Sequence, residues 1–255
     1  MKRTSKLLAL MLALVLCLGA IALSSCGSSK EKLIVGITEY APMDYKDDKG
    51  NWTGFDAEFA TMFAKELGYE VEFKVIDWDN KLLELESKAI DCIWNGMTIT
   101  GEIKDSCAVS DPYVRNQQVV VMKADKADSY KDAESMKDLK FAAESGSAGQ
   151  TSILDNINEN ANLTAVTAQS DALLEVASGS VDACVIDATM AAAMTGEGTS
   201  YADLKVALTL ADEEYGVAFR KDSDLCAKFN DFKKKVTESG ELKTLADKYC
   251  LTLIG

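Results

Sequence analysis

The chain has 255 residues, a formal net charge of −14 and no histidine. The absence of histidine excludes histidine-based catalytic triads, histidine general bases and the usual zinc sites that contain histidine. We expect no cofactor and no metal ion. A chain this acidic is repelled by nucleic acid and by anionic membrane surfaces, so we expect no nucleic-acid partner and no attraction to a membrane through charge. The length suffices for one large domain or for two domains of ordinary size.

The N-terminal segment has the pattern of a secretory signal. A basic start is followed by an uncharged apolar run, Leu7–Leu23, and then by Ser24-Ser25-Cys26. Such a run before small residues marks a signal peptide. A plain transmembrane anchor is the alternative, but the run is shorter than the roughly 20 residues that span a bilayer. The cysteine at this position resembles the lipobox of bacterial lipoproteins, which implies that residues 1–25 are removed, that Cys26 carries lipid and that residues 26–32 form a flexible tether.

Strands and helices alternate after the tether, which is typical of an α/β fold. Apolar residues at helical spacing predict a helix that opens at Gly54-Phe55-Asp56 and stops at Gly68, because glycine favours the left-handed turn after a helix. Around it we expect strands at 33–36, 71–75 and 90–94 and a helix at 81–87. Further along we expect strands at 140–143 and 181–186 and helices at 188–195, 222–238 and 241–249.

The chain contains a faint internal repeat. The segment Leu82–Asp91, with the sequence LLELESKAID, is matched by Leu173–Asp182, with the sequence LLEVASGSVD. Each copy predicts a helix, a tight turn, an aspartate and a strand. The repeat indicates two lobes of similar topology and specifies no function.

Two apolar β-rich segments, Gln117–Met122 and Tyr215–Phe219, join the lobes in this interpretation. Lobe 1 then comprises residues 33–117 and 215–255, and lobe 2 comprises residues 118–214. A chain that leaves one lobe, builds the other and returns forms a hinge, and lobes around a hinge can close on a ligand.

The cysteines that follow Cys26 are scattered and include no CxxC motif; they are Cys92, Cys107, Cys184, Cys226 and Cys250. An odd number without regular spacing is poor support for a disulfide framework or a metal site. We expect most of them to be small buried hydrophobic residues. Cys226 and Cys250 form the one pair that we would test for a disulfide.

A series of short motifs follows the tether: Gly54-Phe55-Asp56, Gly96-Met97-Thr98-Ile99-Thr100, Ser110-Asp111-Pro112-Tyr113, Ser145-Gly146-Ser147, Val181-Asp182-Ala183, Asp187, Tyr215-Gly216-Val217-Ala218 and Ser239-Gly240-Glu241-Leu242. Their order resembles the polar amino-acid family of extracellular solute-binding proteins, which serve ABC importers. The resemblance implies the type II periplasmic-binding-protein-like fold, with two α/β lobes and a solute between them. It also implies a monomer outside the cytoplasmic membrane, which closes on a small molecule and docks on the ABC permease subunits.

The resemblance assigns roles within lobe 2. An amino-acid ligand needs a carboxylate for its ammonium group, donors for its carboxylate and a shaped wall for its side chain. Asp187 matches the family aspartate that binds the ammonium group, and an N-cap for the helix at 188–195 is the alternative. The turn Ser145-Gly146-Ser147-Ala148 matches the loop that binds the ligand carboxylate, although such turns are often plain connectors.

In lobe 1 the resemblance assigns three sets of ligand contacts. Tyr40 and Trp78 match an aromatic pair that sandwiches the ligand. Gly96, Met97 and Thr98 match the end of a strand that offers backbone and hydroxyl groups, and Glu39 and Asn95 flank these positions. Core packing is the alternative for the aromatic pair.

One position departs from the family. Family members carry an arginine that binds the ligand carboxylate where this chain has Ile103. Loss of such a charge-assisted contact costs about 10- to 100-fold in affinity. Three alternatives follow: Lys104 or Arg115 replaces the arginine, the turn at 145–148 binds the carboxylate alone, or the ligand lacks a carboxylate.

The last alternative changes the ligand class. Glu39, Glu144 and Asp187 would then form an acidic cleft that favours an amine or another cationic solute. The same carboxylates permit an enzyme of the dehydratase type on this scaffold, with Glu39 or Glu144 as the acid. No nucleophile–base pair stands out, so we expect a binding protein rather than an enzyme.

Overall fold

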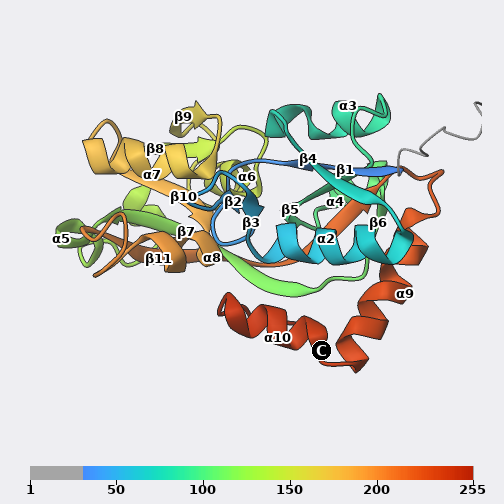
Figure 1. Cartoon of the computed structure of the whole chain (residues 1–255). Helices are drawn as coiled ribbons and strands as arrows, with labels where there is room; N and C mark the ends of the chain where they lie inside the picture. The colour runs from blue at the N-terminus through green and yellow to red at the C-terminus, as the bar shows by residue number, and fades with distance from the viewer. Residues whose placement is uncertain (1–30, 255) are drawn as a thin grey trace, which may run out of the picture. The chain divides into compact units, whose positions relative to one another are not determined.

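A mixed β-sheet runs through residues 31–254, the part of the chain that this computed structural model describes (Figure 1). The predicted signal peptide and lipidated Cys26 lie outside the described residues. The strands are β1 (Lys32–Ile37), β2 (Tyr45–Lys46), β3 (Trp52–Thr53), β4 (Glu70–Val75), β5 (Cys92–Thr98), β6 (Ala108–Val109), β7 (Val114–Lys123), β8 (Lys140–Glu144), β9 (Asn162–Val166), β10 (Ala183–Asp187) and β11 (Leu204–Phe219).

Two long strands in the middle of the sheet connect its two halves. The strand order is β4-β1-β5-β11-β7-β10-β8-β9, and β7 and β11 are antiparallel. β11 pairs with β5 through Tyr215, whereas β7 pairs with β10 through Gln118. β11 begins well before the predicted segment, because β7 offers it backbone partners from Leu204 onward. The lobe boundaries near residues 117 and 215 stay a prediction, which this topology supports.

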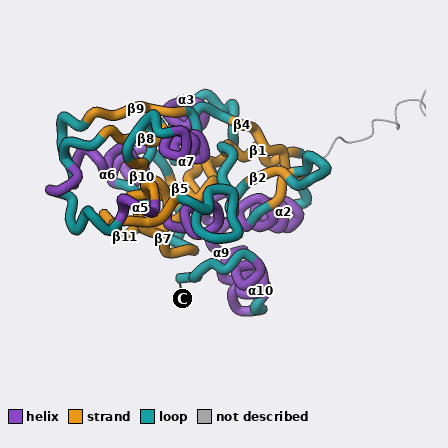
Figure 2. Tube along the Cα trace, turned by 90° about the vertical axis from the view of Figure 1, so that its left-hand side faces the viewer, coloured by secondary structure: helices purple, strands orange, loops and turns teal. Residues whose placement is uncertain are grey.

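Helices alternate with these strands, so the predicted α/β class is confirmed. They are α2 (Phe55–Leu67), α3 (Lys81–Glu86), α4 (Gly101–Ser106), α5 (Ala124–Ala127), α6 (Ala148–Asn156), α7 (Gln169–Ser178), α8 (Ala188–Met194), α9 (Leu225–Glu238) and α10 (Glu241–Lys248). The C-terminal helices α9 and α10 lie beside α2, from the beginning of the chain (Figures 1 and 2). The final helical segment therefore returns to the half of the sheet that contains β1, β4 and β5.

Helix α2 forms as its apolar spacing predicts. Phe55, Phe59 and Phe63 are fully buried, and Phe59 and Phe63 pack against the indole of Trp94 in β5. The helix ends at Gly68, which adopts the left-handed conformation expected of a glycine at this position. This packing anchors β5, whose far end reaches the candidate site.

The internal repeat corresponds to two equivalent corners of the structure. Asp91 precedes β5, and its carboxylate accepts the N–H of Ile34 in β1 at 2.9 Å. Asp182 precedes β10, and its carboxylate accepts the N–H of Lys140 in β8 at 2.9 Å. Both aspartates join a parallel strand pair, β1–β5 in one half and β8–β10 in the other. The repeat therefore places the ends of β5 and β10 in equivalent positions of the two halves.

Some boundaries and cysteine environments differ from the predictions. The strand expected at 90–94 begins at Cys92, because residues 87–91 form the turn after α3. Cys92, Cys107 and Cys184 are buried as expected, whereas Cys226 is half-buried and Cys250 is exposed; all are free thiols. No helix within residues 31–254 combines the length and the apolar character that crossing a bilayer requires.

Candidate functional site

A cavity of about 260 Å³ lies at the ends of β5 and β10. Its wall combines the end of β5, the last residue of β10, the turn before α6 and the segment around α3. Most of the predicted ligand-binding residues line it, namely Trp78, Asn95, Gly96, Met97, Thr98, Gly146, Ser147, Ala148 and Asp187. Residues that are far apart in the sequence, from both predicted lobes, therefore meet at one cavity.

Tyr40, Glu39 and Ser145 do not line this cavity. Tyr40 is 1% exposed, and its hydroxyl makes a hydrogen bond of 2.6 Å with the hydroxyl of Tyr215. Its ring lies directly behind Gly96, where an added Cβ would be 2.5 Å from it. Glu39 is exposed, and the N–H of Ser145 is bonded to the backbone of β9. Tyr40 packs in the core, the alternative considered for it, and ligand contacts by these three residues stay predictions.

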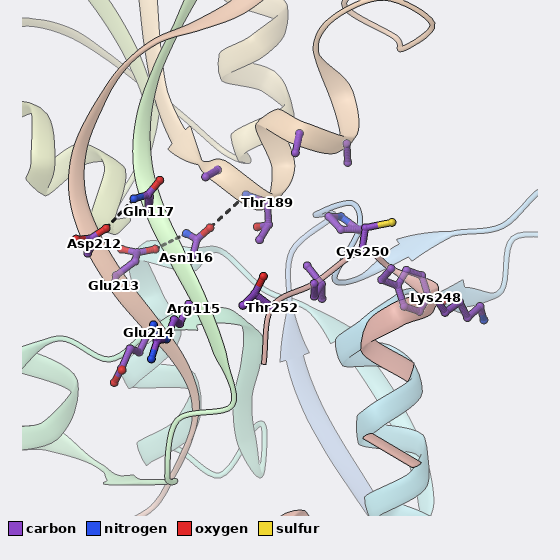
Figure 3. A pocket seen from close by; sticks show the side chains of 16 residues that line it. Arg115, Asn116, Gln117, Thr189, Asp212, Glu213, Glu214, Lys248, Cys250 and Thr252 are labelled. Atoms are coloured by element: carbon purple, nitrogen blue, oxygen red, sulfur yellow. Dashed lines mark hydrogen bonds between the residues drawn. The ribbon is translucent and has the colours of Figure 1, made fainter. Parts of the chain in front are cut away.

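A larger cavity of about 1060 Å³ lies along the two long strands, α8 and residues 248–252 (Figure 3). Apart from Arg115, one of the two candidate replacements for the family arginine, the predicted ligand-binding residues do not line it. In Figure 3 the Asn116 amide donates to Glu213, at 2.6 Å, and accepts the N–H of Thr189, at 3.2 Å. Because the smaller cavity collects the predicted residues and the unpaired polar groups described below, we place the candidate site there.

Asp187 closes one end of this site. It is 2% exposed, and its carboxylate accepts hydrogen bonds from the amides of Asn116 (2.8 Å), Gln118 (2.5 Å) and Gln169 (2.5 Å). Burial raises the pKa of this carboxyl. Asp187 stands at the N-cap position of α8, but its side chain makes no capping hydrogen bond. The carboxylate is therefore directed to the amides and the cavity rather than to the helix.

Two buried acceptors in the cavity have no hydrogen-bond partner among the described residues. They are Oε1 of Glu144, the last residue of β8, and Oε1 of Gln118. Glu144 is 2% exposed, and burial, with the charge of Asp187 adding to it, raises its pKa to about 8. Unpaired buried acceptors are unfavourable, so this cavity is matched to a ligand that donates hydrogen bonds or carries positive charge.

The turn before α6 and the first residue of that helix form another part of the cavity wall. Ser147 is the N-cap of α6, and its hydroxyl accepts the N–H of Gln150 at 3.1 Å. Gly146 has a φ of +67°, and an added Cβ would lie 2.6 Å from Oδ1 of Asp79. This close approach requires glycine, and it brings the turn against the segment that leads into α3. The start of α6 favours an anionic group.

The end of β5 is held in place by buried side chains. The Asp56 carboxylate accepts the N–H of Gly96 at 2.6 Å and the hydroxyl of Tyr113 at 2.9 Å. Asn95 accepts the N–H and hydroxyl of Thr38 and donates to the carbonyl of Thr38 and to Asp44. These four bonds saturate the Asn95 amide. Asn95 lines the cavity, and these bonds fix its side chain; its ligand contact stays a prediction. Asp56, whose motif was noted without a site role, holds the backbone of β5 in position.

Sequence reasoning missed several residues that line the site. Gln118 and Gln169 carry no motif, and their role follows from their bonds to Asp187.

Ile103 lines the cavity, so the position of the family arginine does face the site. Neither candidate replacement does, because Lys104 and Arg115 line other cavities. The lysine in the wall of this cavity is Lys81, in α3.

Residues 33–252 match the family described as bacterial extracellular solute-binding proteins, family 3. The arginine-binding extracellular protein ArtP of Bacillus subtilis (strain 168) is 35% identical over 244 residues, which cover 89% of this chain and 92% of that protein.

Solved structures of high similarity have the same fold. An ancestral arginine-binding protein bound to arginine has a TM-score of 0.80 at 33% identity, covering 87% of this chain and 99% of that chain. An ancestral amino-acid-binding protein, a precursor of cyclohexadienyl dehydratase, has a TM-score of 0.78 at 32% identity, covering 86% and 95%. The predicted type II periplasmic-binding-protein-like fold is confirmed.

Proposed function

The chain belongs to family 3 of the bacterial extracellular solute-binding proteins, and we propose that its ligand is a basic amino acid, with arginine the first candidate. It is an extracytoplasmic substrate-binding protein of an ABC importer. The observation that carries the choice of ligand is the pair of unpaired acceptors, Glu144 Oε1 and Gln118 Oε1, in a cavity that also holds Asp187.

A basic amino acid satisfies these groups in a specific way. Asp187 binds the α-ammonium group, and Glu144 with Gln118 Oε1 accepts hydrogen bonds from the cationic side chain. A guanidinium group offers several donors in one plane and suits two acceptors better than a neutral side chain does. The cavity volume of about 260 Å³ is near the lower end of ligand cavities, about 300 Å³, and so suits a small solute.

The relatives support this choice. The chain is 35% identical to a protein named for arginine binding and 33% identical to an ancestral arginine-binding protein solved with arginine. Both similarities cover more than four fifths of this chain. A cationic ligand also fits the acidic cleft that the sequence predicts.

Ligand capture works by closure of the two lobes. Lys81, in predicted lobe 1, donates to the carbonyl of Gly146, in predicted lobe 2, at 2.8 Å. Contacts of this kind exist only when the lobes are together, and a ligand that touches both lobes favours that state. The closed form then docks on the permease subunits as a monomer. We expect the lipid on Cys26 to keep the protein at the membrane.

Calorimetry and thermal-shift measurements on residues 26–255 test the ligand. We expect L-arginine and other basic amino acids to bind and raise the melting temperature, and L-glutamate not to bind. Glu144→Gln should weaken arginine binding by about 10- to 100-fold. Glu238→Gln is the matched control, because Glu238 is exposed and outside the cavity. Binding of a neutral or acidic amino acid with no response to arginine would refute the proposal.

An enzyme remains the second candidate, because Glu144 is a buried carboxyl whose raised pKa suits a general acid. One structural relative is described as the precursor of a dehydratase. Incubation of cyclic acids with the protein, followed by product analysis, distinguishes the two functions. Recovery of the ligand unchanged supports the receptor, and turnover that is lost in Glu144→Gln supports the enzyme.

A further inference from the structure

Lys81, the first residue of α3, is a buried cation in the wall of the ligand cavity. It is 8% exposed and lines the cavity together with Ile103, the residue at the family arginine position. Among the described residues that line this cavity, Lys81 is the only lysine or arginine. The family arginine is therefore absent from this cavity, but a positive charge is present in it.

Lys81 has hydrogen-bond partners but no counter-ion among residues 31–254. Its ammonium group donates to the carbonyl oxygens of Trp78, at 3.2 Å, and Gly146, at 2.8 Å. An ammonium group has three N–H bonds, so one remains for a ligand. A buried ammonium group without a carboxylate partner is unfavourable. Burial lowers the pKa of Lys81, although nearby carboxylates oppose this shift.

The surroundings of this ammonium group suit an anion. The bond to Gly146 brings it to the turn that leads into α6. The N–H groups of Ala148 and Gly149, the first two in α6, have no hydrogen-bond partner in the described part of the chain. Free N–H groups at a helix start favour negative charge. A cation and a helix start therefore meet in the wall of the cavity that Ile103 also lines.

We infer that Lys81 binds the carboxylate of the amino-acid ligand, together with the start of α6, in place of the arginine that Ile103 replaces. The inference rests on the proposed function, since it requires a ligand with a carboxylate. The contact supplies the missing counter-ion of Lys81. The ligand then spans the cavity, with its carboxylate at Lys81 and its ammonium group at Asp187.

A structural latch is the alternative role for Lys81, because its bond to Gly146 joins the two predicted lobes. Ligand chemistry separates the two roles. Agmatine is arginine without the carboxylate, and it keeps the guanidinium group and the amine. A latch supports closure on both ligands equally, whereas a carboxylate contact favours arginine alone.

Calorimetry with L-arginine and agmatine tests the inference in the wild-type chain, Lys81→Met and Lys104→Met. We expect Lys81→Met to reduce the ratio of arginine affinity to agmatine affinity by about 10- to 100-fold. Lys104→Met removes an exposed lysine outside the cavity and should leave the ratio unchanged. Adding Ile103→Arg to Lys81→Met should restore most of the ratio, because it returns the cation to the family position.

An unchanged ratio in Lys81→Met overturns the inference in either of two forms: equal loss of both affinities identifies a latch, and no loss of either shows that Lys81 does not contact the ligand. Circular dichroism checks folding, and Lys81→Gln, which keeps a donor for Gly146, replaces Lys81→Met if that variant does not fold. Arginine binding with an unchanged ratio refutes this inference alone. If another amino acid binds instead, the proposal of arginine fails, and the ratio is measured for that amino acid and its decarboxylated amine.

Discussion

Asp187 and Glu213 are held by the same two amide side chains, those of Asn116 and Gln118. The Asn116 nitrogen donates to Asp187 Oδ1 at 2.8 Å and to Glu213 Oε1 at 2.6 Å. The Gln118 nitrogen donates to the same oxygens at 2.5 and 3.0 Å. Burial raises the pKa of both carboxyls, that of Glu213 to about 8. Two carboxyls this close hold a proton between them near neutral pH.

A cationic ligand at Asp187 competes with that proton, so affinity should depend on pH. Glu144, whose pKa is also raised to about 8, adds to the effect. Binding of a cation favours the ionised carboxylates. Below pH 8 these carboxyls carry a proton that binding must release, whereas above pH 8 they are already ionised and no proton is released. We expect arginine affinity to rise from pH 6 to pH 8, by up to about tenfold per pH unit for each proton released.

Calorimetry in buffers of different ionisation enthalpy measures this proton release directly. Glu213→Gln should flatten the pH profile, because it leaves Asp187 without a carboxyl partner. Asp212→Asn is a matched control, since Asp212 is exposed and lies outside the cavity. Affinity that is independent of pH, without proton release, would show that the pair does not couple to the ligand.

Glu144 should also make the ligand-free protein less stable as pH rises. Burial raises its pKa from 4.5 to about 8, so the folded chain keeps a proton that the unfolded chain loses above about pH 4.5. Its contribution to stability is fully present below pH 4.5 and is lost as pH rises through 8, by up to about 1.4 kcal/mol per pH unit.

Melting temperatures at pH 5 and pH 8 check this expectation. The wild-type value should fall over this range, and Glu144→Gln should fall less and melt higher than wild type at pH 8. Glu39→Gln, at an exposed position, should follow the wild type. An equal fall in Glu144→Gln would mean that Glu144 is not the titrating group.

Local motifs and the repeat made much of the fold predictable. The apolar face of α2 and its terminal glycine act over a few residues, so sequence spacing reveals them. Asp91 and Asp182 recur in the repeat because each joins the start of a strand to its parallel neighbour. The starts of β5 and β11 were less predictable, because pairing partners far along the chain decide where those strands begin.

The site residues that belong to a motif were predictable. Those whose role depends on contacts between segments far apart in the sequence were not. Asp187 and the turn at 145–148 belong to motifs, and the cavity contains Asp187 and most of that turn. Asn95 flanks the site in sequence, but its amide is used by Thr38 and Asp44, a contact that spacing does not reveal. Lys81 lies near Gly146 only because the two halves of the chain fold together.

Asp187→Asn tests the ammonium assignment. The carboxylate accepts three amide donors, and an asparagine at this position loses the charge and points an N–H toward one of them. We expect arginine affinity to fall about 100-fold or more, because a buried charge-assisted contact is lost. Asp182→Asn, at a structural corner of the same lobe, should affect stability more than affinity. Calorimetry and melting curves on both variants check this contrast, and wild-type affinity in Asp187→Asn would show that the ammonium group binds elsewhere.

Gly146→Ala should hinder closure of the lobes. The added Cβ would lie 2.6 Å from Asp79 Oδ1, and the residue also has a φ of +67°. Gly179→Ala is the matched control, because Gly179 has a φ of +81° but nothing within 4 Å of an added Cβ. Both variants bear the strain of a left-handed residue, and Gly146→Ala alone adds the clash.

We expect solution scattering to show a more open form for Gly146→Ala, with lower affinity for both arginine and agmatine. A closed form with unchanged affinity would mean that the Asp79 segment moves aside and that this contact does not control closure.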